Sequence, residues 1–378
     1  MKGSWVSVDG AVLAANIAAL RAALQPRTEI MFVIKADAYG HGLLPTAQLA
    51  VAAGVRWFGV AHLREALQVR AVLPSVNLLV MGVVEPADAA VVARENLACM
   101  VVDVAHGRAL AAAARAAGVT VRAHLKVDTG MGRLGVQWPA AVASFAALQG
   151  MPELVWEGIC SHFATVEPEQ PSSAATQAER FLTIAAAAEE RLGRPLRKHI
   201  SSSRAIVYHP EWDLEMVRPG IALYGYGAAE AGLRFQTAPA LQWQCQVMQV
   251  KSVPAGTAVG YYGTHVTPAP TRLAILSAGY ADGYHRALSN RGHVLIRGRR
   301  CRVVGRVSMN WISVDVGPEG PAEPGDTAVL IGQQGSVSVW AGELARLCRT
   351  IPYEMLVGID RQAERHYIND AATSPRSC

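Results

Sequence analysis

The segment IMFVIKADAYGHG, residues 30–42, places a lysine directly after a run of apolar side chains and then brings in two glycines. Ile30–Ile34 is entirely apolar and has the length and β-branched content of a buried strand. Lys35 therefore ends a buried strand, where partial desolvation lowers the pKa of an amine and favours Schiff-base chemistry with an aldehyde. A lysine that simply extends into solvent is the alternative that this segment alone leaves open.

Seven more segments of strand length follow, and segments with helical spacing of apolar residues lie between several of them. Strands are expected at residues 30–34, 57–60, 77–81, 98–102, 121–127, 154–160, 198–201 and 216–217, and helices at residues 11–24, 63–72, 105–117 and 177–192. Eight alternating units in about 230 residues predict an α/β fold, a (β/α)8 barrel of the TIM type. A doubly wound open sheet is the alternative, but it usually has fewer strands, and nothing here marks a switch point.

The pattern changes after about Gln236. Short strands are expected at residues 241–250, 272–277, 293–296, 302–307, 312–316 and 327–331, with Gly/Pro turns between them and one helix at residues 339–346. We therefore expect a barrel domain over residues 1–235, a mostly β C-terminal domain over residues 236–370, and a disordered tail over residues 371–378.

Composition excludes several classes of protein. The chain has 378 residues, of which 51% are hydrophobic and 17% charged, so it can bury a large core and is not expected to be disordered. A long uncharged stretch, residues 134–152, contains Pro and Gly and does not suit a membrane. The N-terminus lacks the apolar run of a secretion signal, which predicts a cytoplasmic protein. Basic residues are scattered, so no nucleic-acid partner is expected.

The six cysteines are widely separated and form no Cys-x-x-Cys pair, so neither a disulfide framework nor a zinc site is predicted. No set of His, Asp and Glu occurs at the spacing of metal ligands either. The sequence therefore does not favour a metal-dependent barrel enzyme.

In a barrel of this type the active site lies at the C-terminal ends of the strands. The fifth strand ends in Lys126 and continues through a glycine-rich stretch to Arg133, and the sixth leads into His162. The eighth leads into Arg218. Two cations near three glycines suggest a backbone that approaches an anion closely.

A phosphate site is predicted at the same end of the barrel. Ser203 and the N–H groups of Gly220 and Ile221 follow the seventh and eighth strands, where barrels often bind phosphate. A lysine, an imidazole, an arginine and a phosphate site facing one opening are what pyridoxal 5′-phosphate (PLP) requires. The residues alone therefore favour a PLP site.

These motifs resemble those of the alanine racemases, a family of PLP-dependent amino-acid racemases. The likeness follows the chain in order and includes the β domain; it is carried by Val33–Gly42, Lys126–Gly135, His162–Thr165, Arg218–Ile221, Gly279–Gly283, Gly305–Met309 and Tyr353-Glu354. The resemblance implies an isomerase that interconverts L- and D-alanine by a two-base mechanism.

By this resemblance Lys35 carries the cofactor and acts as the base on one face of the substrate Cα. The other cofactor-binding residues would be Tyr39, Ser203, Gly220, Ile221 and Tyr353 at the phosphate, His162 stacked on the ring, and Arg218 at the pyridine nitrogen. A guanidinium does not readily supply a proton, so the ring would be a weaker electron sink, which favours racemisation over transamination.

The resemblance assigns the second base to Tyr261, with Tyr262 as the fallback if the register is shifted. In the family this tyrosine reaches the barrel of the partner subunit, so a homodimer with shared active sites is implied. Arg133 and the backbone N–H of Met309 would bind the substrate carboxylate. Lys126 corresponds to a lysine that is often carbamylated in the family; an ordinary ion-paired lysine is the alternative.

Several positions depart from the family pattern. Asn310 replaces an aspartate, Ser202 stands in place of an asparagine, and Tyr262 stands where relatives usually have glycine. Residues 361–365 also lack the usual Arg-Val-Pro-Arg. These departures leave open a racemase of serine or of a broader set of amino acids.

Two other classes remain as alternatives. A PLP-dependent decarboxylase shares the fold, but its chemistry benefits from a protonated pyridine nitrogen, which Arg218 disfavours. A non-catalytic PLP carrier would resemble the barrel alone and would leave Tyr261 and Met309 without a purpose.

Overall fold

The computed structural model describes residues 3–167, 171–227 and 233–369, so the tail predicted at residues 371–378 lies outside the described residues. The chain forms two compact units. The barrel unit comprises Leu13–Ala38 and Leu43–Thr237. The C-terminal unit comprises the chain up to Val12, the short segment Tyr39–Gly42, and the chain from Ala238 onward.

The barrel unit contains a parallel sheet of eight strands in the order β10-β2-β3-β4-β5-β6-β8-β9. Its strands are β2 (Glu29–Val33), β3 (Trp57–Val60), β4 (Asn77–Val80), β5 (Ala98–Val101), β6 (Val121–Asp128), β8 (Leu154–Cys160), β9 (Arg197–His199) and β10 (Met216–Val217), with β7 (Val136–Gln137) paired to the end of β6. A parallel bridge between Ser202 and Arg218 joins the chain after β9 to the chain after β10 and closes the sheet. The predicted TIM-type barrel is confirmed.

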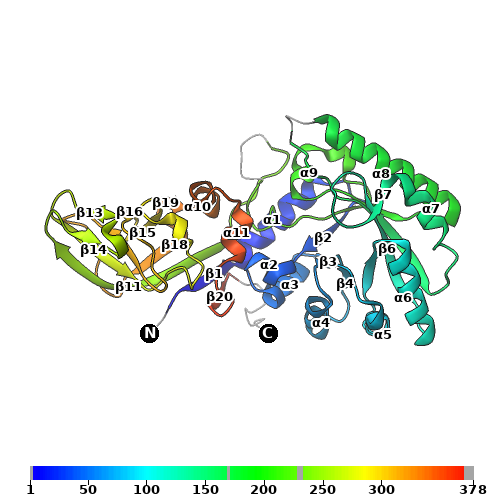
Figure 1. The fold of residues 1–378 in the computed structure, drawn as a ribbon, viewed down its shortest axis with the longest axis horizontal. Helices are drawn as coiled ribbons and strands as arrows, with labels where there is room; N and C mark the ends of the chain where they lie inside the picture. Colours follow the sequence, from blue (N-terminus) through cyan, green and yellow to red (C-terminus); the bar gives the residue numbers. More distant parts are fainter. Residues whose placement is uncertain (1–2, 168–170, 228–232, 370–378) are drawn as a thin grey trace, which may run out of the picture. The chain divides into compact units, whose positions relative to one another are not determined.

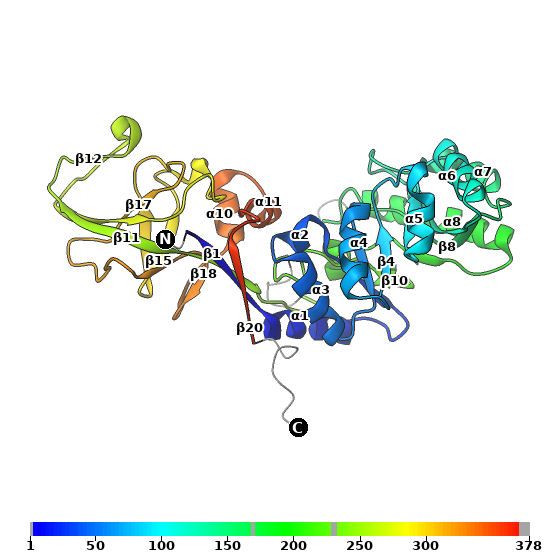
Figure 2. The ribbon, with the colours of Figure 1, turned by 90° about the horizontal axis from the view of Figure 1, so that it is seen from below.

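Helices lie outside these strands, as Figures 1 and 2 show. They are α1 (Gly10–Ala23), α2 (Lys35–Tyr39), α3 (Leu43–Ala52), α4 (Leu63–Val72), α5 (Ala89–Arg94), α6 (Val104–Ala116), α7 (Ala141–Ala146), α8 (Pro171–Leu192) and α9 (Ser203–Tyr208), with the 3-10 turns η1 (Pro86–Asp88), η2 (Trp138–Ala140) and η3 (Pro210–Trp212). Polar caps begin some of them: the Asp103 carboxylate accepts the N–H of His106 at 2.7 Å at the start of α6. Within the described residues no helix is both long and apolar enough to span a membrane.

Large apolar side chains fill the inside of the barrel. Met31, Trp57, Leu79, Met100 and Met216 form one buried cluster, with contributions from β2, β3, β4, β5 and β10. Because protein cores pack as densely as organic crystals, this cluster holds the strand ends in fixed positions.

The C-terminal unit contains a mostly antiparallel sheet in the order β19-β18-β15-β16-β17-β14-β11-β1-β20, with β18 also paired to β11. Its elements are β1 (Trp5–Asp9), β11 (Leu241–Val253), β12 (Ala258–Val259), η4 (Tyr261–Gly263), β13 (His265–Val266), β14 (Thr271–Leu276), η5 (Arg286–Leu288), β15 (His293–Ile296), β16 (Arg299–Val303), β17 (Ile312–Asp315), β18 (Thr327–Gln334), β19 (Val337–Val339), α10 (Ala341–Cys348), α11 (Pro352–Val357) and β20 (Glu364–Ile368).

Two features of this unit differ from the sequence analysis. The segment WVSVD at Trp5–Asp9 forms strand β1, which pairs antiparallel with β11 and parallel with β20 and so places the chain start in the C-terminal unit. Its alternation of buried and half-buried residues suits one face of a sheet. A second helix, α11, follows α10; it has only six residues and begins with Pro352, whose fixed φ suits the first turn.

Candidate active site

Candidate residues gather at the C-terminal ends of the barrel strands. Lys35 follows β2, Lys126 lies two residues before the end of β6, His162 follows β8, Ser203 begins α9 after β9, and Arg218 follows β10. Parallel strands end at the same opening of a barrel, so the fold brings these side chains together. Their mutual electrostatic effects agree, because Arg218, Lys126, Arg133 and Lys35 all lower the pKa of His162.

The backbone after Lys35 forms a left-handed turn. Ala36, Asp37, Ala38 and Tyr39 have φ between 51° and 56°, a conformation that non-glycine residues rarely adopt. Side-chain carboxylates hold the turn at two points: Glu65 Oε1 accepts the N–H of Ala36 at 2.8 Å, and Asp37 Oδ1 accepts the N–H of Leu43 at 2.8 Å. These bonds offset the cost of the turn and fix the residue that follows Lys35.

The amine of Lys35 is set up to lose its proton more easily than a free lysine. Burial lowers its pKa most, and the nearby charge of Arg133 lowers it further, whereas Glu65 acts in the opposite direction. A larger neutral fraction makes the amine a better nucleophile toward a carbonyl. This agrees with the expectation drawn from its place after an apolar strand.

The guanidinium of Arg218 is buried and enclosed by acceptors. Nη1 donates to the carbonyl oxygen and to Nδ1 of His199, both at 2.7 Å. Nη2 donates to the carbonyl oxygens of Ser161 at 2.7 Å and Ile200 at 3.1 Å, and lies 3.3 Å from Nδ1 of His162. Across the described part of the chain, Nε of Arg218 donates no hydrogen bond. One N–H of a fixed cation is thus left for a further acceptor, as the nitrogen of a pyridine ring would be.

His162 is neutral in this setting. Burial lowers its pKa to about 2, and the charge of Arg218 is the next largest cause. Gln177, on α8, donates to the carbonyl oxygen of His162 at 3.2 Å and accepts the N–H of Ala164 at 2.9 Å. A neutral imidazole held by its backbone suits stacking against a flat ring.

Ser203 and the chain after β10 form a small polar cradle. The hydroxyl oxygen of Ser203 accepts the N–H of Gly220 at 2.9 Å and the N–H of Ala222 at 3.2 Å. Ser203, Gly220 and Ile221 are all buried. Backbone N–H groups beside a hydroxyl are the donors that phosphate binding uses.

Lys126 lies near the end of β6 and Arg133 lies in the loop after it, and Asp128, the last residue of the strand, shapes that loop. The Asp128 carboxylate accepts the backbone N–H groups of Gly130, Met131, Gly132 and Arg133 at 2.8–3.1 Å. Burial lowers the pKa of Lys126 to about 8. A buried amine that is partly neutral near pH 8 can react with carbon dioxide, which fits the expected carbamylation.

The remaining candidates belong to the C-terminal unit. The rings of Tyr39 and Tyr353 lie 5.8 Å apart between centroids, and burial raises the pKa of Tyr39. Tyr261, Tyr262 and Met309 are exposed, by 67%, 88% and 54%. Tyr262 has φ +65°, which explains why a glycine fits this position well.

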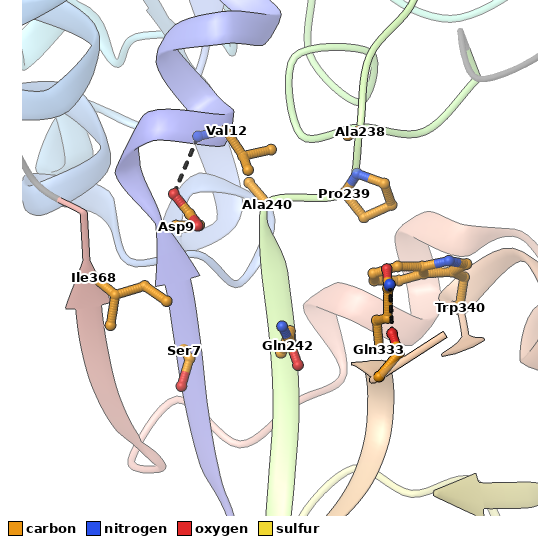
Figure 3. A pocket seen from close by; sticks show the side chains of 11 residues that line it. Ser7, Asp9, Val12, Ala238, Pro239, Ala240, Gln242, Gln333, Trp340 and Ile368 are labelled. Atoms are coloured by element: carbon orange, nitrogen blue, oxygen red, sulfur yellow. Dashed lines mark hydrogen bonds between the residues drawn. The ribbon is translucent and has the colours of Figure 1, made fainter. Parts of the chain in front are cut away.

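A hollow of about 400 Å³ lies elsewhere in the C-terminal unit. Figure 3 shows Ser7 and Asp9 of β1, Gln242 of β11 and Trp340 around it. None of the candidate residues lines it. No group of three or more His, Cys, Asp or Glu side chains able to hold a metal ion occurs in residues 3–167, 171–227 and 233–369.

Four residues around the site were not predicted from the sequence. His124 and His199 stand within strands, where they look like ordinary core residues; Glu65 lies in a helix, and Asp128 was quoted only as part of a motif. The available signal was position: each lies within a few residues of a predicted strand end at the barrel opening or on the inward face of a strand.

Comparison with known proteins identifies the family. Residues 8–228 match the family model "Alanine racemase, N-terminal domain" and residues 240–367 match "Alanine racemase, C-terminal domain". The chain is 42% identical to the alanine racemase of Symbiobacterium thermophilum, over 98% of this chain and 99% of that one.

Solved structures agree. The alanine racemase of Streptomyces coelicolor A3(2) has a TM-score of 0.91 and 36% identity, covering 97% of this chain and 98% of that one. The alanine racemase of Bartonella henselae, solved with covalently bound pyridoxal phosphate, has a TM-score of 0.85 and 29% identity, covering 97% and 100%. The resemblance predicted from the sequence is confirmed, and this chain belongs to the alanine racemase family.

Proposed function

We propose that this chain is a PLP-dependent racemase that interconverts L- and D-alanine, with the cofactor in the barrel opening. The observation that supports this proposal most directly is the set of hydrogen bonds that surrounds the Arg218 guanidinium. Four of the five N–H donors of a guanidinium are used by protein acceptors, and Nε–H remains for the pyridine nitrogen. The relative with covalently bound pyridoxal phosphate supports the same cofactor here.

Lys35 would bind the cofactor through its amine and hold a proton on one face of the substrate Cα. When bound, pyridoxal phosphate supplies an electron sink that makes the Cα proton removable. Arg218 would donate a hydrogen bond to the ring nitrogen and keep its own proton, because a guanidinium is a very weak acid. By leaving the ring unprotonated, Arg218 would favour return of a proton to Cα over transamination.

The phosphate would lie against Ser203, Gly220 and Ile221, with the hydroxyl groups of Tyr39 and Tyr353 as further donors. The Ser203 hydroxyl accepts two backbone N–H groups and would donate its own proton to the phosphate. His162, kept neutral by burial, would stack on the ring without adding charge.

The second proton-handling group would be Tyr261, supplied by the partner subunit of a homodimer. Its 67% exposure in the single chain leaves the phenol available to another subunit. Arg133 and the N–H of Met309 would bind the substrate carboxylate. A carbamylated Lys126 would carry a negative charge and orient Arg133; the lowered pKa of Lys126 supports this modification.

Alanine is the substrate that the family supports, and the alternatives of serine, a broader range or decarboxylation are not favoured by the relatives. A cytoplasmic location and a role in supplying D-alanine for the cell wall belong to the same proposal.

Chiral analysis tests this function. Purified protein loaded with PLP is incubated with each L-amino acid, and both enantiomers are quantified; Lys35→Ala is the control. We expect D-alanine from L-alanine, and no conversion by the control. Faster conversion of another amino acid would contradict alanine as the preferred substrate. Release of carbon dioxide together with an amine would contradict racemisation as the reaction.

A further inference from the structure

Two buried histidines connect Arg218 to the middle of the barrel. Nε2 of His199 and Nδ1 of His124 lie 2.8 Å apart, and Nδ1 of His199 lies 2.7 Å from Nη1 of Arg218. His124 is on β6 and His199 ends β9, with β8 between the two strands. Both imidazoles are fully buried. The contact therefore crosses a complete strand inside the barrel.

Gly158 on β8 makes this contact possible. It pairs with His124 on one side and with Arg197 on the other. A Cβ at this position would lie 2.4 Å from Nδ1 of His124 and 2.6 Å from its Cε1, which is closer than atoms can approach. The φ of Gly158 is not in the left-handed region, so conformation does not require glycine here. Glycine is needed at position 158 because the imidazole of His124 occupies the space that a side chain would fill.

The hydrogen bonds fix the tautomer of each ring. A guanidinium only donates, so Nδ1 of His199 must accept and its proton lies on Nε2. Nε2–H of His199 then donates to Nδ1 of His124, whose proton must lie on Nε2 as well. The chain of donors therefore has defined directions: Arg218 donates to His199 from one side, and His199 donates to His124 on the other.

Both imidazoles are held neutral. Burial lowers the pKa of His124 to about 3 and lowers that of His199 well below its ordinary value. The charge of Arg218 is the next cause for His199, and the charges of Arg197 and Arg122 follow burial for His124. A neutral ring keeps one acceptor nitrogen, which the contact with Arg218 needs.

Glu157 stands at the outer end of the chain. Its Oε2 lies 3.9 Å from Nε2 of His124, and among the described residues neither atom has a hydrogen-bond partner. Its other oxygen accepts Nε–H of Arg122 at 2.7 Å. The carboxylate thus faces the one N–H of the histidine pair that the pair itself does not use, which favours the same tautomer of His124.

We propose that His199 and His124 are positioning residues for Arg218: as a pair in fixed Nε2–H tautomers, they hold the guanidinium so that its Nε–H meets the cofactor ring. The consequence for catalysis rests on the proposed function. The assignment of the tautomers is independent of it, because it follows from the hydrogen bonds alone. Without the acceptor on the His199 ring, one N–H of Nη1 loses its partner, and the guanidinium is held by the carbonyl oxygens of His199, Ser161 and Ile200 alone, which fixes its orientation less tightly. A guanidinium that no longer covers the ring nitrogen would leave that nitrogen open to protonation by water, which would strengthen the electron sink and raise transamination relative to racemisation.

Nitrogen NMR tests the geometry directly. The protein is labelled with ¹⁵N in histidine side chains, with and without PLP, and the two signals of each ring are assigned from His124→Asn and His199→Asn variants. We expect His124 and His199 to be neutral with the proton on Nε2 at pH 7, in both samples. A proton on Nδ1 of either residue, or a charged ring, would overturn the inference.

Paired variants test the consequence. The amide oxygen of His124→Asn can take the place of Nδ1 and accept from His199, whereas His124→Gln places its oxygen near the position of Nε2. We expect His124→Asn to keep the Nε2–H tautomer of His199 and the wild-type ratio of pyruvate released to alanine racemised. His124→Gln should raise that ratio roughly three- to tenfold, the range set by loss of one hydrogen bond. Equal ratios for the two variants would overturn the positioning role.

Gly158→Ala gives a second route that leaves both histidines in place. It should separate the rings, change the ¹⁵N signals of both, and raise the same ratio. The matched control is Gly59→Ala on β3, where the three atoms nearest to a new Cβ belong to flexible methionine side chains, at 3.1–3.2 Å. If Gly158→Ala fails to fold, the comparison of His124→Asn with His124→Gln still tests the positioning role. If wild-type protein racemises no alanine, the proposed function fails, and the NMR result stands on its own.

Discussion

The carboxylate of Glu65 accepts the backbone N–H of Ala36 at 2.8 Å, which attaches helix α4 to the residue after Lys35. Its other oxygen accepts the N–H groups of Ala61 at 2.8 Å and His62 at 3.1 Å, at the end of β3. One buried anion therefore joins the ends of two neighbouring strands and lies close enough to Lys35 to raise its pKa.

Removing this charge should make Lys35 less basic. We expect Glu65→Gln to lower the pKa of Lys35 below its wild-type value, since Glu65 acts against the lowering by burial and Arg133. The variant should also lose stability, by about 1–3 kcal/mol for each backbone amide left without an acceptor. The pH dependence of reductive methylation at Lys35 in cofactor-free protein, read by peptide mass spectrometry, measures the first effect. Glu153→Gln, which removes another largely buried carboxylate, paired with the exposed Arg115, is the control; an unchanged Lys35 profile in Glu65→Gln contradicts the account.

Ser203→Ala should weaken cofactor binding. The hydroxyl that accepts the N–H groups of Gly220 and Ala222 would be lost, together with a donor to the phosphate. A hydrogen bond to a charged group contributes about 1.5–3 kcal/mol, so the dissociation constant for PLP should rise about 10–100-fold. Equilibrium titration of cofactor-free protein measures it. Ser201→Ala is the matched control, because that hydroxyl donates to the carbonyl oxygen of Trp212 instead, and an equal loss in both variants would argue against the phosphate assignment.

Acid should destabilise the barrel through its buried histidines. Burial lowers the pKa of His124 to about 3 and that of His162 to about 2. At mildly acidic pH these histidines therefore bind protons in the unfolded chain but stay neutral in the folded chain. Stability from these groups is present above the unfolded pKa of about 6.5 and is lost as pH falls below it, by about 2 kcal/mol per histidine at pH 5. Thermal melting at pH 7.5, 6 and 5 measures the slope. His124→Asn should flatten it, and an unchanged slope would show that His124 does titrate normally in the folded protein.

The barrel was predictable because its strands are short apolar runs with separate helices between them. The predicted bounds at Trp57–Val60 and Leu154–Cys160 match β3 and β8. Prediction failed where charge obscured a strand: β16 begins with Arg299, and its exposed arginines alternate with buried side chains. The strand was expected at residues 302–307, because only there does the sequence become apolar.

The residues proposed to bind the cofactor could be named from motifs, but the groups that support them could not. Lys35 and Arg218 stand in recognisable segments, and the structure places both at the barrel opening. The contact between His124 and His199 depends on a glycine in the strand between them, Gly158. No spacing along the chain reveals such a contact, because it arises from strand order and from the absence of a side chain.

The second base can be tested by mixing variants. Tyr261→Phe should lose about 10²–10⁴-fold in racemisation, the usual contribution of a general acid or base. If Tyr261 acts in the partner's barrel, mixing Lys35→Ala with Tyr261→Phe subunits restores one intact site in each mixed dimer. About half of the dimers are then mixed, so roughly a quarter of wild-type activity should return. Repeating the mixture with Tyr262→Phe checks the register; confirmed subunit exchange with no recovery from either tyrosine variant would refute the shared site.

The site of covalent attachment tests the central claim, that the barrel opening holds the cofactor on Lys35. Protein purified with PLP is reduced with borohydride, digested, and analysed by mass spectrometry. Both Lys35 and Lys126 have lowered pKa values at this opening, so the measurement discriminates between two plausible amines. The account predicts the cofactor mass on the peptide that contains Lys35, and its absence from Lys35→Ala protein. Attachment to Lys126 or to another lysine, or no attachment with PLP in excess, would contradict it.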